Sequence, residues 1–199
     1  MTARTASRKR STKETSVFVN LDVDGSGLAE VSTGLPFFDH MLAQLARHSF
    51  MDMELKAEGD LAVDAHHTVE DTGIVLGEAF HHALGDKAGV RRFASVAVPL
   101  DEALVEVALD LSGRPYLSYA LCLPPDASPL GSPGFEPQLA EEFWRAFVVA
   151  GALTLHVRSV SGRNTHHLLE ASFKAVALAL RDALRREGTG VPSTKGSLG

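Results

Sequence analysis

Two copies of one short motif are the clearest chemical feature of this chain. The motif is His-His-x-x-Glu, and its side chains are His66, His67, Glu70, His166, His167 and Glu170. Imidazole nitrogen and carboxylate oxygen at these spacings are typical ligands of Mn, Fe, Co or Zn, whereas Ca and Mg prefer shells made only of oxygen. One copy alone would more often be a surface feature of a helix, but two copies in matching contexts predict two metal ions.

A hydrophobic run with helical periodicity follows each motif, so each motif is expected on a helix. Neighbouring residues of a helix point about 100° apart, whereas residues three or four apart share a face. Glu70 can therefore bind an ion together with His67 or with His66, and the remaining histidine is left for a second ion. The second motif has the same choice, and the spacing leaves both arrangements open.

The sequence around the two motifs is also repeated. Each half begins with an alternating strand and a turn. A helical run follows, then another alternating strand, and then the motif. We predict two halves, 13–96 and 97–187, each with the order strand, strand, helix, strand, helix. An alternating strand has one apolar side that must be covered, so each half should form a sheet with helices packed on one face. The expected fold is α/β or α+β, within one catalytic domain overall.

The repeat also relates two further candidate ligands. His40 stands near the start of the helical run in the first half, and Glu142 stands at the corresponding place in the second half. We expect His40 to add a ligand, and Glu142 is a candidate for the same role. Acidic residues are also favoured in the first turn of a helix by its dipole, which leaves an ordinary structural role open for Glu142.

Composition excludes several classes of function. The net charge of −6 argues against a general affinity for nucleic acid, which requires a basic face. Cys122 is the only cysteine, so a disulfide within the chain and a thiolate zinc cluster are excluded, and we expect a cytoplasmic protein. Neither a secretory signal nor an apolar stretch of about 18–20 residues is present, so no membrane partner is expected. Residues 1–12 are polar and basic and are predicted to be a disordered tail.

The C-terminal segment 188–199 is a candidate phosphate-binding loop. Ser193 offers a hydroxyl group, Lys195 offers a cation, and the surrounding backbone offers further donors. A frayed terminus is the alternative, and it is the more common reading of such a segment. Arg92 and Arg114 are expected to add bidentate contacts to a phosphate group.

Seven motifs together resemble the imidazoleglycerol-phosphate dehydratase family of histidine biosynthesis. They follow one another in the family's order from about Lys13 to Leu198. The motifs are Thr12–Thr15, Phe38–Gln44, Asp64–Asp71, Pro99–Ala103, Asp110–Pro115, His166–Lys174 and Pro192–Gly196. The resemblance implies a duplicated α/β fold and a homo-oligomer, expected to contain 24 subunits, with active sites at subunit contacts.

The resemblance also implies two Mn(II) ions in each active site. One ion would be held by His66, His166 and Glu170. The other ion would be held by His40, His67, Glu70 and His167. The family has a further histidine ligand for the first ion, and in this chain Glu142 stands at that position.

The implied reaction is the loss of water from D-erythro-imidazoleglycerol phosphate to form imidazole acetol phosphate. The proton to be removed is on a carbon without a neighbouring carbonyl, so two metal-bound ring nitrogens are needed to hold the ring as an activating imidazolate. Glu14 and Glu170 are the candidates for proton transfer, and Glu14 is also expected to contact the substrate. Gln44 would orient the substrate diol. The residues expected to bind the phosphate group are Arg92, Arg114, Ser193 and Lys195.

Two other functions fit the ligand sets alone. The first is a di-metal hydrolase of a small imidazole or amide substrate, which requires a water-bridged metal pair about 3.5–4 Å apart. The second is a metal-binding cage without catalytic activity, for which the Lys195 side chain would have no role.

Overall fold

The alternating segments of the sequence form two four-stranded sheets in the computed structural model, which describes residues 3–198. In the first sheet the strand order is β1-β2-β4-β3, and only the β3–β4 pair is parallel. The elements of the first half are β1 (Thr5–Ser11), β2 (Thr15–Asp22), β3 (Ala29–Ser32), α1 (Pro36–Ser49), β4 (Asp52–Gly59) and α2 (His66–Leu84).

The second half repeats this topology. Its strand order is β5-β6-β8-β7, and again only one pair, β7–β8, is parallel. The elements are β5 (Phe93–Leu100), β6 (Ala103–Asp110), β7 (Tyr116–Ala120), α3 (Leu139–Gly151), β8 (Thr154–Ser161) and α4 (Thr165–Ala183). The predicted α+β fold and its internal duplication are confirmed, with one more strand in each half than predicted.

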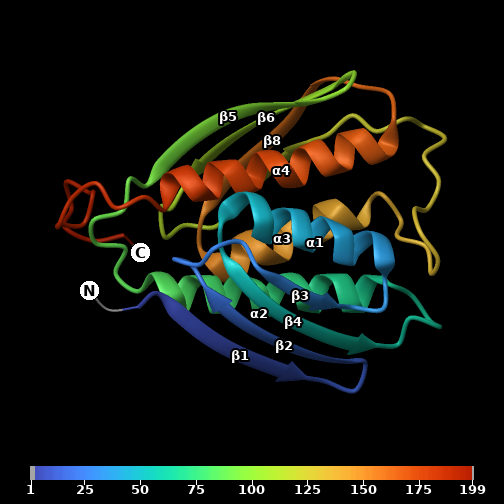
Figure 1. The fold of residues 1–199 in the computed structure, drawn as a ribbon, viewed down its shortest axis with the longest axis horizontal. Helices are drawn as coiled ribbons and strands as arrows, with labels where there is room; N and C mark the ends of the chain where they lie inside the picture. The colour runs from blue at the N-terminus through green and yellow to red at the C-terminus, as the bar shows by residue number, and fades with distance from the viewer. Residues whose placement is uncertain (1–2, 199) are drawn as a thin grey trace.

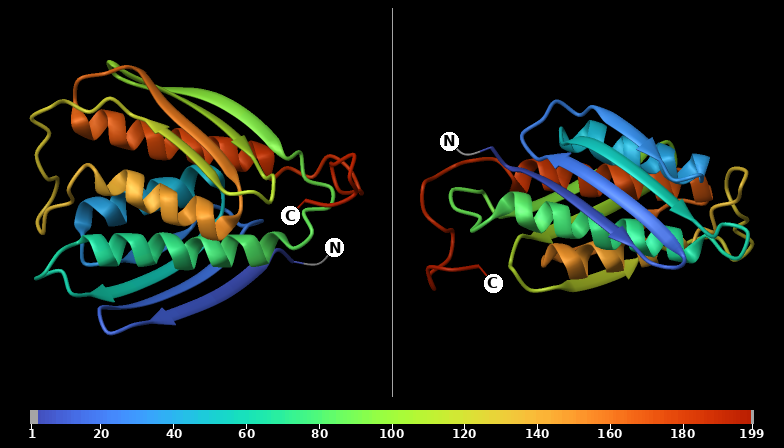
Figure 2. Two further views of the ribbon diagram at one scale, coloured as in Figure 1. Left: turned by 180° about the vertical axis from the view of Figure 1, so that it is seen from behind. Right: turned by 90° about the horizontal axis from the view of Figure 1, so that it is seen from below.

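The four helices lie between the two sheets, as Figures 1 and 2 show. Alternate residues of the central strands point inward, and Val19 on β2 and Val105 on β6 are both completely buried. The opposite faces of the sheets remain partly exposed. Each sheet is therefore covered by helices on one face, as the alternating pattern predicts.

Helices α2 and α3 approach each other closely at two glycines of α2. A Cβ atom on Gly73 would lie 2.7 Å from the carbonyl oxygen of Phe143, and one on Gly77 would lie 2.7 Å from that of Phe147. Both distances are shorter than a side chain can tolerate. The absence of a side chain at these positions therefore sets the spacing between α2, which carries the first motif, and α3.

The prediction of a disordered N-terminal tail is wrong for residues 5–11. These residues form β1, which pairs with β2 along its full length, from Thr5 opposite Asp22 to Ser11 opposite Ser16. Edge strands tolerate polar and charged residues because much of their surface faces solvent. Residues 1–2 of the predicted tail lie outside the described residues.

The predicted boundary between the halves, at 96/97, is also wrong, because it divides β5. This strand pairs with β6 from Phe93 opposite Asp110 to Leu100 opposite Ala103, and Ala94 and Val98 point into the core. The repeats therefore extend over residues 5–84 and 93–183. The limits of a repeat follow from which strands pair, and the alternating pattern of one segment does not reveal its partner.

The segment 188–198 has no helix or strand, but it is attached to the body of the protein. The backbone N–H of Gly89 donates to the carbonyl oxygen of Gly190 at 2.8 Å. The Arg92 guanidinium donates to the carbonyl oxygen of Pro192 at 2.8 Å. Residue 199 lies outside the described residues. Among residues 3–198, no helix combines the length and the apolar character needed to cross a membrane.

Candidate active site

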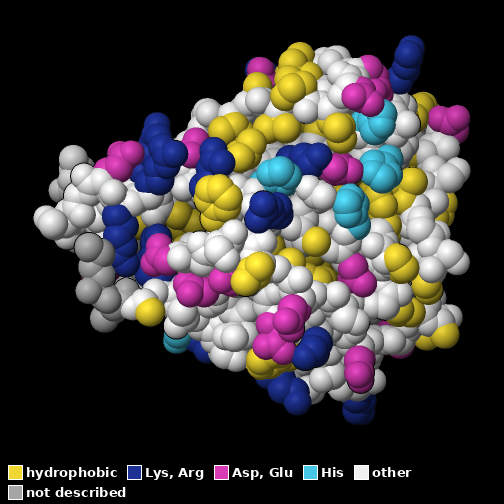
Figure 3. Space-filling view, viewed as in Figure 1, with side chains coloured by type: hydrophobic (Ala, Val, Ile, Leu, Met, Phe, Trp, Pro, Cys, Tyr) yellow, Lys and Arg dark blue, Asp and Glu magenta, His cyan; other side chains and the backbone are white. Residues whose placement is uncertain are grey.

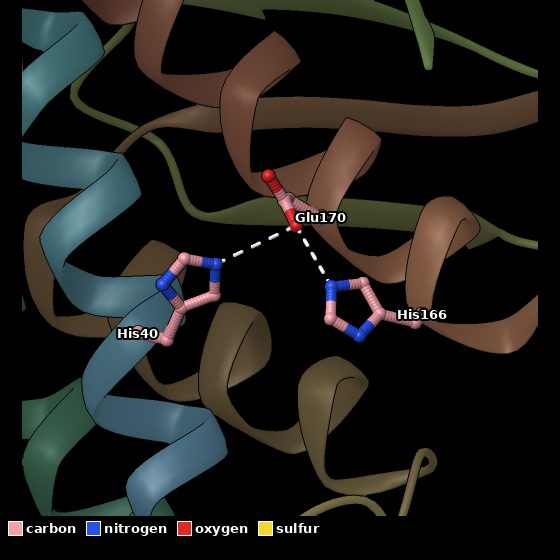
Figure 4. A group of neighbouring side chains, drawn as sticks. All are labelled: His40, His166 and Glu170. Atoms are coloured by element: carbon pink, nitrogen blue, oxygen red, sulfur yellow. Dashed lines mark hydrogen bonds and ion pairs between the residues drawn. The ribbon is translucent and has the colours of Figure 1, made fainter. Parts of the chain in front are cut away.

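Helices α1 and α4 together bring three potential metal ligands to one place. His166 and Glu170 are one helical turn apart on α4, and His40 faces them from α1. The Glu170 Oε2 atom lies 2.9 Å from His166 Nε2 and 3.5 Å from His40 Nε2 (Figure 4). Within residues 3–198, this is the only group of three His, Cys or acidic side chains whose ligand atoms all lie within 4.8 Å of one another.

Glu170 is held in its ionised form although its side chain is only 12% exposed. Burial alone would raise the pKa of this carboxyl group, but hydrogen bonds from Lys174 and His166 outweigh burial and lower the pKa to about 2. Lys174 Nζ lies 2.6 Å from Glu170 Oε1, on the side away from the histidines. The carboxylate therefore keeps one oxygen for the two imidazoles.

The second histidine of this motif points to a different carboxylate. His167 Nδ1 lies 2.8 Å from Glu102 Oε2, in the turn between β5 and β6, while His167 Nε2 lies 3.8 Å from Asp101 Oδ2. The hydrogen bond from His167 and those from the backbone N–H groups of Asn164 and Arg163 lower the pKa of Glu102 to about 2. An ionised carboxylate can only accept, so Nδ1 of His167 carries the hydrogen.

The first motif shows a similar arrangement at the start of α2. His67 Nδ1 lies 3.2 Å from both carboxylate oxygens of Asp60, and this hydrogen bond raises the pKa of His67. His66 Nε2 lies 3.9 Å from Glu70 Oε2, so this pair shares a helix face without a hydrogen bond. In one chain Glu70 therefore lies next to His66, whereas the resemblance assigns Glu70 and His67 to the same ion, and His67 turns toward Asp60.

Glu14 lies beside the first motif. It occupies the turn between β1 and β2, and its carbonyl oxygen accepts a hydrogen bond from the Asp60 N–H at 3.1 Å. The charge of Glu14 also contributes to the raised pKa of His67. Asp71 holds this hairpin to α2, because its carboxylate accepts hydrogen bonds from Arg10 and from Thr15.

Gln44 lies on α1, one turn after His40. Its Oε1 atom is 3.0 Å from His48 Nε2, so the amide group is already oriented by a neighbour. Burial and the nearby charge of Lys174 lower the pKa of His48. Gln44 is thus one helical turn from His40, a member of the cluster with His166 and Glu170.

Glu142 lies on α3 outside that cluster. Its nearest charged partner is Arg145, whose Nε atom lies 3.9 Å from Glu142 Oε2, and its side chain is 37% exposed. The side chain is at a place in α3 that resembles the place of His40 in α1, as the repeat predicts. Within one chain, however, Glu142 does not join the group of His40, His166 and Glu170 (the His40 group).

The residues predicted to bind phosphate line one hollow of about 680 Å³. They are Arg92, Arg114, Ser193 and Lys195. Arg92 is anchored by Asp110, which accepts two hydrogen bonds at 2.7 and 3.1 Å. The Arg92 guanidinium also donates a hydrogen bond to the carbonyl oxygen of Pro192, which holds the C-terminal segment over the hollow. The structure thus brings the four predicted residues together, with Arg92 also serving as a structural anchor.

The hollow and the His40 group lie at opposite ends of α4. His166 is in the first turn of this 19-residue helix, whereas the segment 188–198 follows its last turn (Figures 1 and 2). A helix of this length extends roughly 27 Å. The first motif is also separate, because α2 packs against the first sheet and α3, whereas α4 packs against the second sheet and α1. One chain therefore presents three parts of the predicted site without joining them.

The surface view supports an exposed position for the ligand cluster. Several histidine side chains gather on one face, over the beginning of α4 and the neighbouring part of α1, with acidic and basic side chains among them (Figure 3). The side chains of His40 and His166 are 46% and 44% exposed. They are therefore accessible to a ligand or to another protein surface.

Three supporting residues were missed in the sequence. Lys174 follows Glu170 by one helical turn, so its spacing could have predicted the ion pair. Asp60 and Glu102 lie in turns, and no local spacing relates them to His67 and His167. Only the folded chain shows these two contacts.

Comparison with known proteins identifies the family. Its model, imidazoleglycerol-phosphate dehydratase, matches residues 33–180. The chain is 55% identical over 196 residues to the imidazoleglycerol-phosphate dehydratase of Acidothermus cellulolyticus. This alignment covers 98% of this chain and 93% of the relative. The enzyme of Moorella thermoacetica is 54% identical over 198 residues, with coverage of 98% and 99%.

Solved structures agree with this result. The Pyrococcus furiosus protein of that name, in complex with (S)-C348, is 37% identical with a TM-score of 0.82, and the alignment covers 96% of this chain and 100% of that one. The Staphylococcus aureus protein is 35% identical with a TM-score of 0.81 and coverage of 92% and 99%. The chain therefore belongs to the imidazoleglycerol-phosphate dehydratase family.

Proposed function

We propose that this chain is a hydro-lyase that converts D-erythro-imidazoleglycerol phosphate to imidazole acetol phosphate in histidine biosynthesis. The observation that carries the proposal is the convergence of His40, His166 and Glu170 in a member of this family. Relatives matched over almost their whole length are named as dehydratases, which favours this reaction over the hydrolysis of an amide or imidazole bond.

The donor atoms fit manganese. Two imidazole nitrogens and an ionised carboxylate oxygen form a mixed N and O set, which suits Mn(II) better than Ca or Mg. We propose two ions in each active site. The first would be held by His66, His166 and Glu170, with Glu142 as a further ligand. The second would be held by His40, His67, Glu70 and His167.

The metal ions would supply one chemical function. Bound to both nitrogens of the substrate ring, they would hold it as an imidazolate whose electrons assist the loss of the neighbouring hydroxyl group. The distance of 3.5 Å between His40 and Glu170 supports neighbouring ions, because these two residues belong to different proposed ligand sets.

Glu14 and Glu170 have environments suited to different roles. The pKa of Glu170 is about 2, which suits a permanent ligand and makes this carboxylate a poor proton acceptor near neutral pH. Glu14 lies on a turn beside His67, and we propose that it removes the carbon-bound proton. Gln44 would orient the diol from α1.

The phosphate group would bind in the hollow lined by the C-terminal segment. We propose that Arg114, Ser193 and Lys195 donate to it directly, while Arg92 both contacts it and fixes the loop through Asp110 and Pro192. The backbone N–H of Lys195 donates to Ser193 Oγ at 3.2 Å, which gives this loop a defined turn.

A complete site requires more than one subunit. The hollow and the His40 group are at opposite ends of α4, which extends roughly 27 Å, whereas the substrate is a small molecule. We infer a homo-oligomer with active sites at subunit contacts, and we propose the 24-subunit assembly that the family resemblance implies.

The test is turnover by the purified, Mn(II)-loaded protein. Imidazoleglycerol phosphate should lose water, and imidazole acetol phosphate should accumulate in equal amount. A correctly assembled protein with a full complement of metal and no turnover would refute the proposal. A metal-loaded structure provides a second test, since the hydrolase alternative requires a water-bridged pair about 3.5–4 Å apart.

A further inference from the structure

Two carboxylates outside the proposed ligand sets hold equivalent histidines by the same ring nitrogen. Asp60 contacts Nδ1 of His67 at 3.2 Å, and Glu102 contacts Nδ1 of His167 at 2.8 Å. His67 and His167 are the second histidines of the two motifs. The first histidines, His66 and His166, have no such contact at Nδ1 among residues 3–198.

The duplication alone does not explain this pair of contacts. Asp60 follows β4, the fourth strand of the first sheet, whereas Glu102 lies in the turn between β5 and β6, the first two strands of the second sheet. The counterpart of the Glu102 turn in the first half is the turn that carries Glu14. The two halves therefore reach the same contact from different elements, which favours a shared requirement over simple inheritance of the repeat.

The contact determines which nitrogen can bind a metal. A neutral imidazole has one N–H group, and an ionised carboxylate accepts that hydrogen. With the hydrogen on Nδ1, the lone pair on Nε2 is available to an ion, and the ring is held in one orientation. The nearest acidic oxygen to Nε2 of His167 is Asp101 Oδ2 at 3.8 Å, beyond hydrogen-bond distance.

We propose that Asp60 and Glu102 are positioning residues that present Nε2 of His67 and His167 to a metal ion. The inference rests on the proposed function, in which both histidines bind the same ion, together with His40 and Glu70. It adds a specific consequence. Loss of either carboxylate should lower the affinity for that one ion. The affinity for the ion held by His66, His166 and Glu170 should not change.

Asp60→Ala is the cleaner variant. Within residues 3–198, the Asp60 side chain has His67 as its only hydrogen-bond partner. Glu102 also accepts from the backbone N–H groups of Arg163 and Asn164, at 3.2 and 2.8 Å, and thereby supports the start of α4. For this residue Glu102→Gln is preferred, because the amide oxygen still accepts from the two backbone N–H groups, while the NH2 group faces Nδ1 of His167 and cannot accept its hydrogen.

Mn(II) binding to the assembled, initially metal-free protein tests the inference. Equilibrium dialysis followed by elemental analysis should give two ions per subunit in the wild type. In Asp60→Ala and in Glu102→Gln, the affinity for one ion should fall about 10–100-fold, as for other partners of metal-bound histidines. Asp60→Asn should have a smaller effect, because its amide oxygen still accepts from Nδ1.

Glu54→Gln is the matched control, since Glu54 is paired with Lys56 at 2.8 Å on the outer face of the first sheet. It should bind both ions as the wild type does. The thermal unfolding temperature of metal-free Asp60→Ala should lie close to that of the wild type, because one partly exposed hydrogen bond contributes little to stability. A value close to the wild type separates positioning from a general loss of structure.

Two results would overturn the inference while the wild type binds two ions. One is wild-type affinity for both ions in Asp60→Ala and Glu102→Gln. The other is an equal loss of affinity for both ions in Asp60→Ala. Failure of the proposed function has a different signature, namely a wild type that binds two ions and has no dehydratase activity.

Discussion

At the scale of single residues, Glu170 connects the metal-ligand candidates of two helices. Its carboxylate faces His166 and His40 on one side and Lys174 on the other. The low pKa of this group also links it to the stability of the metal-free protein. A carboxyl group whose pKa is lowered by folding stabilises the folded state above its ordinary pKa, and this contribution is lost as the pH falls toward the folded-state value.

For Glu170, this loss should occur between its ordinary pKa of 4.5 and about 2. We expect the unfolding free energy of the metal-free wild type to exceed that of Glu170→Gln by more at pH 5 than at pH 3. The change in this difference should be about 1–2 kcal/mol. Urea unfolding at the two pH values measures it, and a difference that is the same at both would contradict the predicted role of the ionised carboxylate.

Arg114 provides a second test at this scale. Arg114 lines the same hollow as Ser193 and Lys195. Removing a charge-assisted hydrogen bond to phosphate in Arg114→Ala should lower kcat/KM by roughly 10–100-fold, mainly through a higher KM. The control is Arg158→Ala, because Arg158 pairs with Glu106 on the outer face of the second sheet. Unchanged steady-state kinetics in Arg114→Ala would remove this residue from the phosphate site.

At the scale of elements, the spacing of helices determines where the motifs lie. Gly77 brings α2 close to α3, and the first motif stands at the beginning of α2. The hairpin formed by β1 and β2 is held to α2 by Arg10 and Thr15 through Asp71, which keeps Glu14 beside that motif. The elements therefore act as supports whose separation is set by small residues and by buried polar contacts.

Gly77→Ala tests this spacing. The added Cβ would meet the carbonyl oxygen of Phe147 at 2.7 Å and the backbone nitrogen of Gly151 at 2.9 Å, so the helices must separate. We expect a loss of stability of about 1–3 kcal/mol, although alanine is the better helix former. In the control Gly188→Ala, the added atom meets nothing within 4 Å. Thermal and chemical unfolding of both variants measures the effect, and equal stability would show that the contact is easily relaxed.

At the scale of the whole molecule, the parts of the proposed site lie too far apart to meet in one chain. The His40 group is at one end of α4, the hollow lined by the C-terminal segment is at the other, and the first motif stands at the beginning of a different helix, α2 (Figure 1). The proposed substrate is a small molecule, much shorter than α4, and cannot contact all three parts in one chain. Assembly of several subunits is thus the physical requirement of the proposed reaction.

Mixed assemblies test this requirement. His40→Ala and His67→Ala should each be inactive alone, but assemblies of both should regain roughly a quarter of wild-type activity if subunits mix at random around symmetric contacts. His40→Ala mixed with His166→Ala is the control, because both side chains lie in one cluster of one chain and should not complement. Absence of recovery in the first mixture would favour a site within a single chain.

Much of the site could be predicted from local spacing. His166 and Glu170 are four residues apart, and the helix places them on one face with their atoms 2.9 Å apart. The repeated strands and helices were also predicted, because burial of one side of a strand or helix requires alternating or helical periodicity. The family resemblance connected Arg92, Arg114, Ser193 and Lys195, which the fold brings to one hollow.

Other features depended on pairing and packing, which the pattern of one segment does not show. β1 has too few apolar residues to be recognised, and it is a strand because β2 offers a partner along its whole length. Asp60 and Glu102 reach their histidines only through turns placed by the sheets.

The sequence by itself therefore determined the family, the repeated fold and the candidate ligands, since periodicity and motif order depend on neighbours along the chain. Tertiary structure decided the edge strand, the supporting carboxylates and the separation of the site into three parts, because pairing and packing join residues that no local pattern relates.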